Sequence, residues 1–597
     1  MSPTTTDLSF KARWAQRLVR EKLCAEINAL QPPPKSGPLQ LTPDTLPPDQ
    51  NYEGNQTTGD GDYTPPRKVC IIGAGIAGLY IAMILDSLKV PHLTYDILEA
   101  NSRVGGRVYT HSFSDNLHDY YDIGAMRFPK IPIMDRTFDL FDRTKMPLIP
   151  YYLSGLNTVD LFNDHFSNES SSDPHRVSIA NGGSVPNDVV DNVSKILDEA
   201  FGPYKRMLAS DFDKGFAELM KVDNFSTREF LKRGGPDGNQ TQYDFFSIQW
   251  METKNTSTNL FDQAFSESVI DSLDFDYPDP PEWYCIEGGS SLLINAMNQR
   301  LESSVEIGKR VESISIDHDS IEDGNMSVKC ADETAPRSGY CTVFATPTLG
   351  CLGRMDLQSL ELHPSQKDAI RSLHYDDSVK VALQFSYPWW IVDCGITAGG
   401  VASTDLPLRT CVYPSYNLQD AKDKPAVLLA SYTWAQDANR MGSLVNNINE
   451  DELVELVLRN LARLHAQHIT YDRIKSSFTG IYNAYSWSHD PTTAGAFALF
   501  GPGQFSNLYP YLSRPAADSK FHIVGEAASN HHAWVVGALD SAYAAVYRFL
   551  YRFELWDAIE TLEKEWGKVE ELECGKYGTV HLQVMLGLLR KGEQVRV

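Results

Sequence analysis

The sequence predicts an α/β fold that contains a βαβ unit, and three observations support this prediction. Residues 68–72 form a short apolar run, as expected of a strand buried on both faces. This run leads into residues 73–78, which read G-x-G-x-x-G, and a second apolar run over residues 93–98 ends at Glu99. Together, strand, glycines, helix, strand and terminal acid are typical of a Rossmann-like unit that binds a dinucleotide.

Each part of this unit has a physical role. Gly73 permits the tight turn, Gly75 lets the backbone approach a pyrophosphate, and Gly78 allows the next helix to pack closely on the strand. Free N–H groups at the start of that helix, which carries Leu79, favour phosphate. The carboxylate of Glu99 can accept hydrogen bonds from a ribose diol.

Length and charge limit the possible functions. A chain of 597 residues is too long for one simple core, so two or three packed domains are expected. The formal net charge of −25 argues against nucleic acid or an anionic membrane as a partner. No run of 18 apolar residues occurs, so no membrane span is expected.

Cysteine usage and the N-terminus predict an intracellular protein. The nine cysteines show no metal-binding spacing, which favours reduced thiols and no metal site. The first residues lack the apolar segment of a signal peptide, so a cytoplasmic location is expected. His531 and His532 are adjacent and have no third ligand spaced nearby, so a structural role is favoured over metal binding.

Periodicity predicts the remaining elements. Apolar patterns predict helices near residues 9–30, 451–467 and 538–550, and strands at 304–316, 326–330, 340–345, 379–385, 426–432 and 521–524. Residues 31–66 are rich in Pro, Gly, Asp and Thr and predict an extended arm. Helical patterns separated by polar loops over about 130–275 predict an insertion after the first βαβ unit.

Two further motifs carry a family resemblance. Residues 99–110 read E-x-x-x-R-x-G-G-R-x-x-T, with Arg107 able to neutralise phosphate, and Gly525-Glu526 follows a late apolar run. In these motifs the chain resembles the flavin-dependent amine oxidases and, within them, the L-amino-acid oxidases. The resemblance implies FAD as cofactor and a ribityl hydroxyl as the partner of Glu526. It covers residues 67–555 in patches, and residues 1–66 have no assigned counterpart.

The resemblance also implies a domain plan. An FAD-binding domain would comprise residues 67–110, 278–372 and 515–555, and a mixed-sheet substrate-binding domain 111–166 and 373–514. A helical domain would occupy 167–277, with an N-terminal helix and arm over 1–66 and a helical tail over 556–597. Relatives imply a homodimer or higher homo-oligomer.

Four residues inherit substrate-site roles. Arg127, in the segment Asp122-Ile-Gly-Ala-Met-Arg-Phe-Pro129, would pair with the substrate carboxylate, as its planar bidentate fork suits. Tyr432 would touch the same carboxylate, and Trp534 would flank the substrate amine. Lys380 would hold a water near the flavin and assist the reaction with dioxygen. A surface arginine, an edge-strand lysine and core aromatics are the alternative interpretations of these residues.

The cofactor contacts implied by the resemblance extend along the chain. They are Gly73, Gly75, Ala77, Gly78, Glu99, Arg107, Gly124, Ala125, Met126, Arg127, Val311, Glu526, Ala533, Trp534 and Val535. Residues 493–502, where some relatives attach flavin through a cysteine, contain none, so FAD is expected to bind non-covalently. A substrate-gating histidine of some relatives has no clear match.

The expected activity is oxidative deamination of L-amino acids to 2-oxo acids, with ammonia and hydrogen peroxide as products and dioxygen as oxidant. Three alternatives remain open at this point. They are a monoamine or polyamine oxidase, an amino-acid 2-monooxygenase, and a non-catalytic FAD-binding module.

Overall fold

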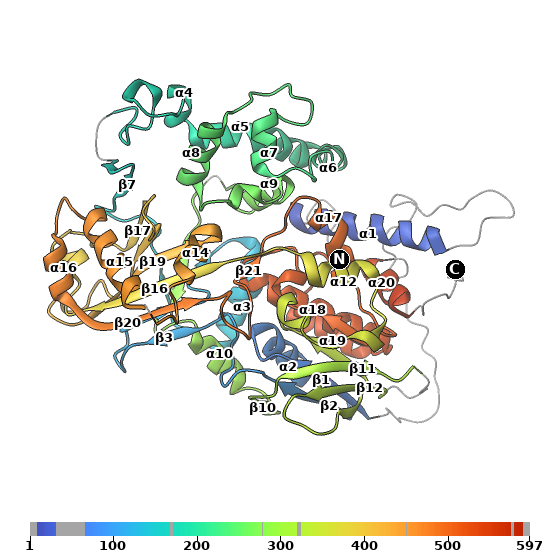
Figure 1. The fold of residues 1–597 in the computed structure, drawn as a ribbon. Helices are drawn as coiled ribbons and strands as arrows, with labels where there is room; N and C mark the ends of the chain where they lie inside the picture. Colours follow the sequence, from blue (N-terminus) through green and yellow to red (C-terminus); the bar gives the residue numbers. More distant parts are fainter. Residues whose placement is uncertain are drawn as a thin grey trace.

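A five-stranded parallel sheet forms around the first predicted strand (Figure 1). Its order is β10 (Val305–Glu306), β2 (Leu93–Leu98), β1 (Arg67–Ile72), β14 (Thr342–Ala345) and β22 (Phe521–Ile523). In the central strand, Val69, Cys70 and Ile71 have no exposed surface. Helices α2 (Ile76–Leu88) and α18 (Val535–Arg552) share one apolar core with this sheet. The predicted βαβ unit is therefore present.

The computed structural model describes residues 9–30, 66–167, 171–277, 279–318, 324–448, 450–574 and 578–588. All but the last residue of the predicted extended arm, 31–66, lies outside the described residues. No helix within the described part of the chain has the length and apolar character needed to cross a membrane.

Two predicted strands are each divided in the structure. The run 304–316 contains β10 and β11 (Val311–Ile316), which belong to different sheets because Gly308, at φ +71°, turns the chain between them. The run 340–345 is split at Cys341, between β13 (Arg337–Tyr340) and β14. Strands β11, β12 (Met326–Cys330) and β13 form a separate antiparallel sheet.

A second, seven-stranded mixed sheet contains the other long predicted strands. Its order is β20 (Phe478–Ser486), β16 (Ser378–Phe385), β19 (Ala426–Trp434), β18 (Thr410–Tyr413), β17 (Gly400–Thr404), β7 (Asp160–Phe162) and β8 (His165–Phe166). The register of β16 and β19 places Lys380 opposite Tyr432. Helix α15 (Glu450–Leu464), predicted as 451–467, shares a core with this sheet.

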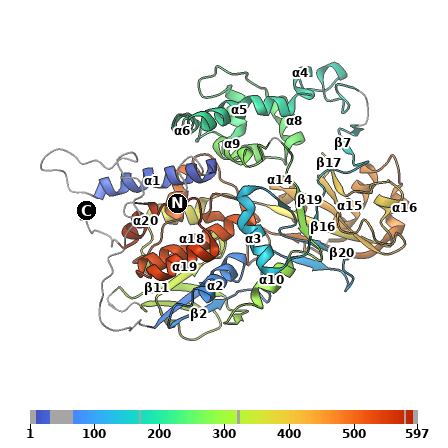
Figure 2. The same cartoon turned by 180° about the vertical axis from the view of Figure 1, so that it is seen from behind.

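Helices α4–α9 form a layer on one side of the molecule, away from both large sheets (Figures 1 and 2). This helical layer comprises α4 (Asn187–Val190), α5 (Val193–Ser210), α6 (Phe212–Met220), α7 (Thr227–Arg233), α8 (Phe245–Asn255) and α9 (Phe265–Leu273). It matches the predicted helical insertion in type, while the exact domain boundaries stay predictions.

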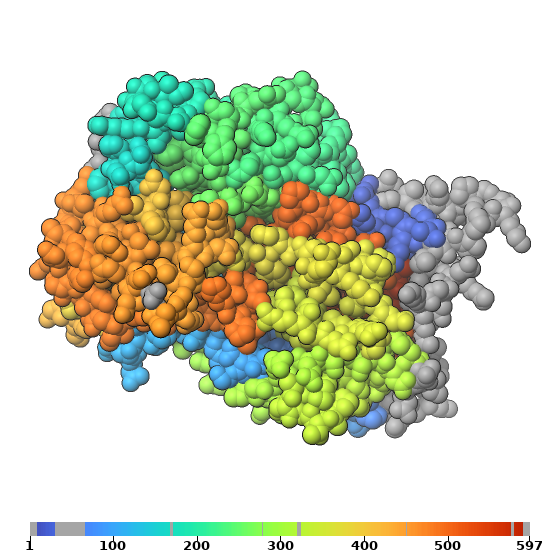
Figure 3. Space-filling model, viewed as in Figure 1, coloured from blue at the N-terminus to red at the C-terminus, as the bar shows by residue number. Residues whose placement is uncertain are grey.

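The predicted N-terminal helix is present as α1 (Phe10–Leu30). Its apolar face is buried and includes Trp14, Leu18 and Leu23. The Trp14 ring lies 4.8 Å from that of Phe216 in α6, and α1 also contacts α9, α17 (Gln504–Leu512) and α20 (Thr579–Leu588). In the space-filling view, α1 lies in blue beside the green helical layer (Figure 3). This helix therefore connects the helical layer with the part of the chain around α17 and α20.

Short elements complete the structure. The remaining strands are β3 (Thr110–Ser112), β4 (Tyr120–Asp122), β5 (Phe128–Pro129), β6 (Leu148–Pro150), β9 (Trp283–Ile286), β15 (Tyr375–Asp376) and β21 (Phe497–Ala498). The remaining α-helices are α3 (Asp135–Thr144), α10 (Ser291–Asn298), α11 (Leu349–Leu352), α12 (Pro364–Ser372), α13 (Trp389–Val392), α14 (Ala435–Gly442), α16 (Tyr471–Ser477) and α19 (Trp556–Trp566).

Candidate active site

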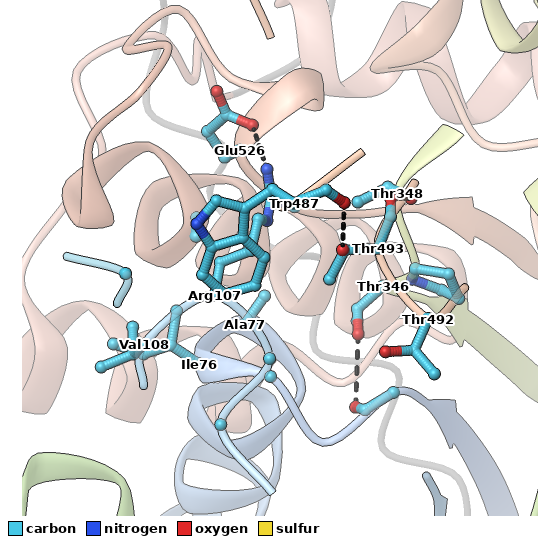
Figure 4. A pocket seen from close by; sticks show the side chains of 18 of the residues that line it. Ile76, Ala77, Arg107, Val108, Thr346, Thr348, Trp487, Thr492, Thr493 and Glu526 are labelled. Atoms are coloured by element: carbon cyan, nitrogen blue, oxygen red, sulfur yellow. Dashed lines mark hydrogen bonds and ion pairs between the residues drawn. The ribbon is translucent and has the colours of Figure 1, made fainter. Parts of the chain in front are cut away.

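A cavity of about 570 Å³ lies where the carboxyl ends of β1, β2 and β14 face strands β16 and β19 of the second sheet (Figure 4). All of the residues predicted for the cofactor and substrate line this cavity except Gly78. Segments far apart in the sequence therefore meet at one place. The individual roles of these residues stay predictions.

The glycines form a cradle at the start of α2. A Cβ on Gly78 would lie 2.0 Å from the carbonyl oxygen of Gly73, so Gly78 serves helix packing and does not face the cavity. A Cβ on Gly75 would meet only the Cα of Gly106, at 4.0 Å. No side chain caps the first turn of α2, which leaves its N–H groups available to a phosphate. The cradle therefore fits a dinucleotide pyrophosphate.

Glu99 is tied to the loop that follows β1. Its Oε2 accepts a hydrogen bond from the backbone N–H of Ala74 at 2.7 Å, and its Oε1 accepts one from Asn101 at 2.7 Å. Burial raises the pKa of Glu99, while these two bonds oppose the shift. Each carboxylate oxygen keeps a second lone pair, which can accept the predicted hydrogen bond from a ribose hydroxyl.

Arg107 and Glu526, both predicted to contact the cofactor, also pair with each other (Figure 4). Arg107 Nη1 lies 3.0 Å from Glu526 Oε2 and also donates to the carbonyl of Ala496. Glu526 Oε1 accepts from the backbone N–H groups of Ala498 and Ala533, at 2.8 and 2.7 Å. The ion pair neutralises both charges, while Arg107 keeps N–H donors and Glu526 keeps lone pairs that these bonds do not use, so their predicted cofactor contacts stay predictions.

Three further arginines that were not among the predicted contacts also line the cavity. Arg103, Arg310 and Arg354 line the cavity and form no ion pair with a carboxylate among the described residues. Arg103 donates to the carbonyl of Gly106 at 3.0 Å, beside the glycine cradle. Arg103 is the first arginine of the R-x-G-G-R pattern, whose second arginine, Arg107, is the predicted phosphate contact.

Lys380 projects from β16 into the wall of the cavity. Its Nζ donates to the backbone carbonyls of Asp122 and Gly124, at 2.9 and 2.8 Å. Burial lowers the pKa of Lys380 to about 7, although the nearby Asp122 carboxylate opposes the shift. An amine of this pKa exchanges a proton near neutrality, as a group that assists proton transfer must.

Arg127 lies at the aromatic end of the cavity. Its guanidinium is 5.7 Å from the centre of the Trp283 ring and forms no ion pair with any described carboxylate. Burial raises the pKa of Tyr151 to about 12 and also raises that of Tyr432, and the Arg127 charge opposes both shifts. Arg127 is therefore a cation flanked by two phenols, a donor group suited to an anion.

Three aromatic side chains at this end of the cavity pack together and are here called the aromatic wall: Phe275, Trp283 and Trp534. Trp283 lies against Arg127, and Trp534 lines the cavity. The rings of Phe275 and Trp283 are stacked, 6.1 Å apart with an interplanar angle of 5°. The ring centre of Trp534 lies 5.9 Å from that of Phe275 and 6.1 Å from that of Trp283. Of this wall, the sequence had pointed to Trp534 alone.

The other predicted cofactor contacts also line the cavity. Gly124, Ala125 and Met126 lie between β4 and β5, Val311 begins β11, and Val535 begins α18. Ala533 adopts φ +64° just before Trp534, which caps α18.

The adjacent histidines face carboxylates. His531 Nδ1 is 3.7 Å from Asp274 Oδ2, and His532 Nδ1 is 2.5 Å from Glu267 Oε1. Both histidines are buried, and each has its own acidic neighbour. A structural role is consistent with this arrangement.

One cysteine, Cys351, lines the cavity. Its thiol donates to the carbonyl of Pro491 at 3.6 Å, and burial raises its pKa. The segment 493–502, which has no cysteine, contributes Thr493, Ala496 and Phe497 to the lining. A hydrogen-bonded thiol with a raised pKa is a weak nucleophile, because the thiolate is the reactive form.

Named relatives cover most of the chain. It is 40% identical over 534 residues to a protein of Dictyostelium discoideum with the provisional name bifunctional amine oxidase, a match that covers 85% of this chain and 48% of that protein. It therefore spans about half the length of that relative. It is 36% identical over 550 residues to L-amino-acid oxidase 4 of Hebeloma cylindrosporum (83% and 85% coverage), and 30% identical over 501 residues to an L-amino-acid oxidase of Siganus canaliculatus (82% and 87%).

Solved structures agree with this fold. Cyclohexylamine oxidase from Brevibacterium oxydans IH-35A superposes with a TM-score of 0.59 at 15% identity, covering 82% of this chain and all of that one. A putrescine oxidase variant gives 0.57 at 16% identity, with the same coverage. At such identity the likeness establishes the fold alone, and it confirms the predicted α/β architecture.

The family model described as flavin containing amine oxidoreductase matches residues 76–550. This span runs from the first residue of α2 to within α18 and so includes the R-x-G-G-R segment, Arg127, Lys380 and Glu526, while Gly73 and Gly75 lie just before it. The chain thus belongs to the flavin-containing amine oxidoreductase family and is a flavin-dependent oxidoreductase.

Proposed function

We propose that this protein oxidises L-amino acids to imino acids, which water hydrolyses to 2-oxo acids and ammonia, while dioxygen is reduced to hydrogen peroxide. The observation that supports the proposal most strongly is Arg127, a cation at the cavity with no ion-pair partner among the described residues. A substrate carboxylate would supply the missing negative charge. The named L-amino-acid oxidase relatives point to the same substrates and to the L configuration.

The surroundings of Arg127 suit a carboxylate. A planar guanidinium binds both oxygens of a carboxylate at once, and the Tyr432 hydroxyl can donate a further hydrogen bond. Leaving a buried, hydrogen-bonded charge without its partner costs about 2–5 kcal/mol. At about 1.4 kcal/mol per tenfold, the carboxylate should contribute tens- to thousands-fold to binding.

The other carboxylates of the cavity do not compete for Arg127. Glu99 and Glu526 are held by backbone N–H groups, and Glu526 also by Arg107. Both acids therefore have fixed partners inside the protein. Arg127 remains the cation beside the aromatic wall.

Bound FAD would supply the redox chemistry, accepting two electrons and a proton from the substrate and passing them to dioxygen. The glycine cradle, the first turn of α2 and Arg103 would hold its phosphates, and Glu99 its ribose. Lys380 would take up or release a proton at Nζ near neutral pH. We infer non-covalent FAD, because the Cys351 thiol is hydrogen-bonded and has a raised pKa, and because the segment 493–502 offers no thiol.

An amine oxidase is the second candidate, favoured by the name of the Dictyostelium relative. Its substrates carry no carboxylate and would leave Arg127 without a partner. An amino-acid 2-monooxygenase would share the carboxylate contact but form an amide and carbon dioxide.

A product assay separates these functions. Purified holoenzyme is supplied with each of the twenty L-amino acids, several D-forms and the matching decarboxylated amines, while peroxide, ammonia and 2-oxo acid are measured. We expect all three products in equal amounts from L-amino acids and little turnover of the amines. Equal or faster oxidation of the amines would refute the proposal, as would amide in place of 2-oxo acid.

A further inference from the structure

Lys11, in the first turn of α1, is a buried cation at the contact between α1 and α9. Only 2% of its side chain is exposed, and its Nζ forms ion pairs with Asp271 and with Asp274, the latter at 3.2 Å. Asp274 is the C-cap of α9, where the helix dipole also favours a positive charge. Lys11 therefore holds the C-terminal end of α9.

Asp274 is directly connected to the aromatic wall. The next residue is Phe275, which stacks on Trp283. Asp274 also lies 3.7 Å from His531, three residues before Trp534. The segments that carry Phe275 and Trp534 are thus both anchored at the carboxylate that Lys11 neutralises.

We propose that Lys11 is a positioning residue for the substrate end of the cavity. Through Asp274 it fixes Phe275 against Trp283 and Trp534, and this wall in turn sets the position of Arg127, whose guanidinium lies over Trp283. The N-terminal helix would thereby contribute to substrate binding without touching the substrate. The kinetic part of this proposal rests on the proposed function, whereas the structural part does not.

The expected effect follows from the contacts of the wall. Aromatic pairs and a cation over an aromatic ring each contribute modestly, so loosening one or two of them should raise KM about three- to tenfold. Since Lys11 is remote from the reacting atoms, kcat should change less than about twofold.

The test compares Lys11→Met with Arg20→Met in the full-length holoenzyme. Arg20 is also on α1, and it pairs with Glu573 (Nη2–Oε1 2.5 Å) instead of with α9, so its loss controls for weakened docking of the helix. Hydrogen exchange is followed over residues 271–277, 283–286 and 529–536, and KM and kcat are measured with L-leucine. Lys11→Arg, which keeps the charge, should behave like the wild type.

We expect faster exchange in these three segments and a higher KM in Lys11→Met, with neither change in Arg20→Met. Equal changes in both variants, or no change in Lys11→Met, would overturn the proposal. If Lys11→Met does not fold, Asp274→Asn keeps the pair of Lys11 with Asp271 and should give the same local response. Exchange that rises as expected in an enzyme that oxidises no amino acid would refute the proposed function and leave the positioning contact standing.

Discussion

Replacing Lys380 with methionine should remove a pH-dependent penalty on the folded state. Burial lowers the pKa of Lys380 from 10.5 to about 7, so between these values the unfolded chain binds one proton more than the folded chain. The free energy of unfolding therefore rises with pH across that window. Below pH 7, where the buried amine is charged in the folded protein, the full cost of burying that charge destabilises the fold. From pH 6 to pH 9 the change spans about two pKa units, or about 2.7 kcal/mol at 1.36 kcal/mol per unit.

The assay is the difference in Tm between wild type and Lys380→Met, measured at pH 6 and at pH 9. For a chain of 597 residues, an unfolding entropy of about 2.1 cal/mol/K per residue converts the change to about 2 °C. We expect the Tm of the wild type, relative to that of the variant, to be about 2 °C higher at pH 9 than at pH 6. The contributions of other titrating groups cancel in this comparison. Lys367→Met, at an exposed lysine of α12, should show no such gain. An equal difference at both pH values would refute the assignment of a neutral amine to Lys380 above pH 7.

Two other predictions concern the cofactor. Gly78→Ala should abolish folded protein because its Cβ would lie 2.0 Å from the Gly73 carbonyl oxygen, whereas Gly75→Ala should fold and lose flavin. Circular dichroism measures folding and flavin absorbance measures bound cofactor. A folded Gly78→Ala, or a Gly75→Ala variant with its full content of flavin, would contradict this prediction. Acid precipitation should release all flavin into the supernatant and leave a polypeptide of unmodified mass, and flavin retained on a peptide containing Cys351 would disprove non-covalent binding.

The first βαβ unit could be predicted from sequence because its signals are local. Strand β2 matches its predicted bounds, and β1 begins one residue earlier than predicted, since strands buried on both faces are continuously apolar. The need for glycine at position 78, where the helix packs closely on the strand, could likewise be predicted from the sequence. Residues 304–316 were harder, because an apolar pattern does not show the turn at Gly308 or which sheet each part joins.

At the site, motifs located the residues but not their partners. The pairing of Arg107 with Glu526 joins positions 419 residues apart and depends on how β21 packs against the turn Glu526–Ala528. Trp283 and Tyr151, which lie near Arg127, and Phe275, which stacks on Trp283, belong to no motif, so only the fold shows that they come together. The importance of Lys11 was also hidden, since a lysine in an amphipathic helix is normally exposed.

The most direct test of the account compares L-leucine with isopentylamine in the wild type and in Arg127→Met. The two substrates differ by the carboxylate alone. We expect the variant to lower kcat/KM for leucine about thirtyfold to several thousandfold, as about 2–5 kcal/mol implies, and to change kcat/KM for the amine less than about threefold. Equal losses for both substrates, or unchanged kcat/KM for leucine, would contradict the assignment of Arg127 to the substrate carboxylate.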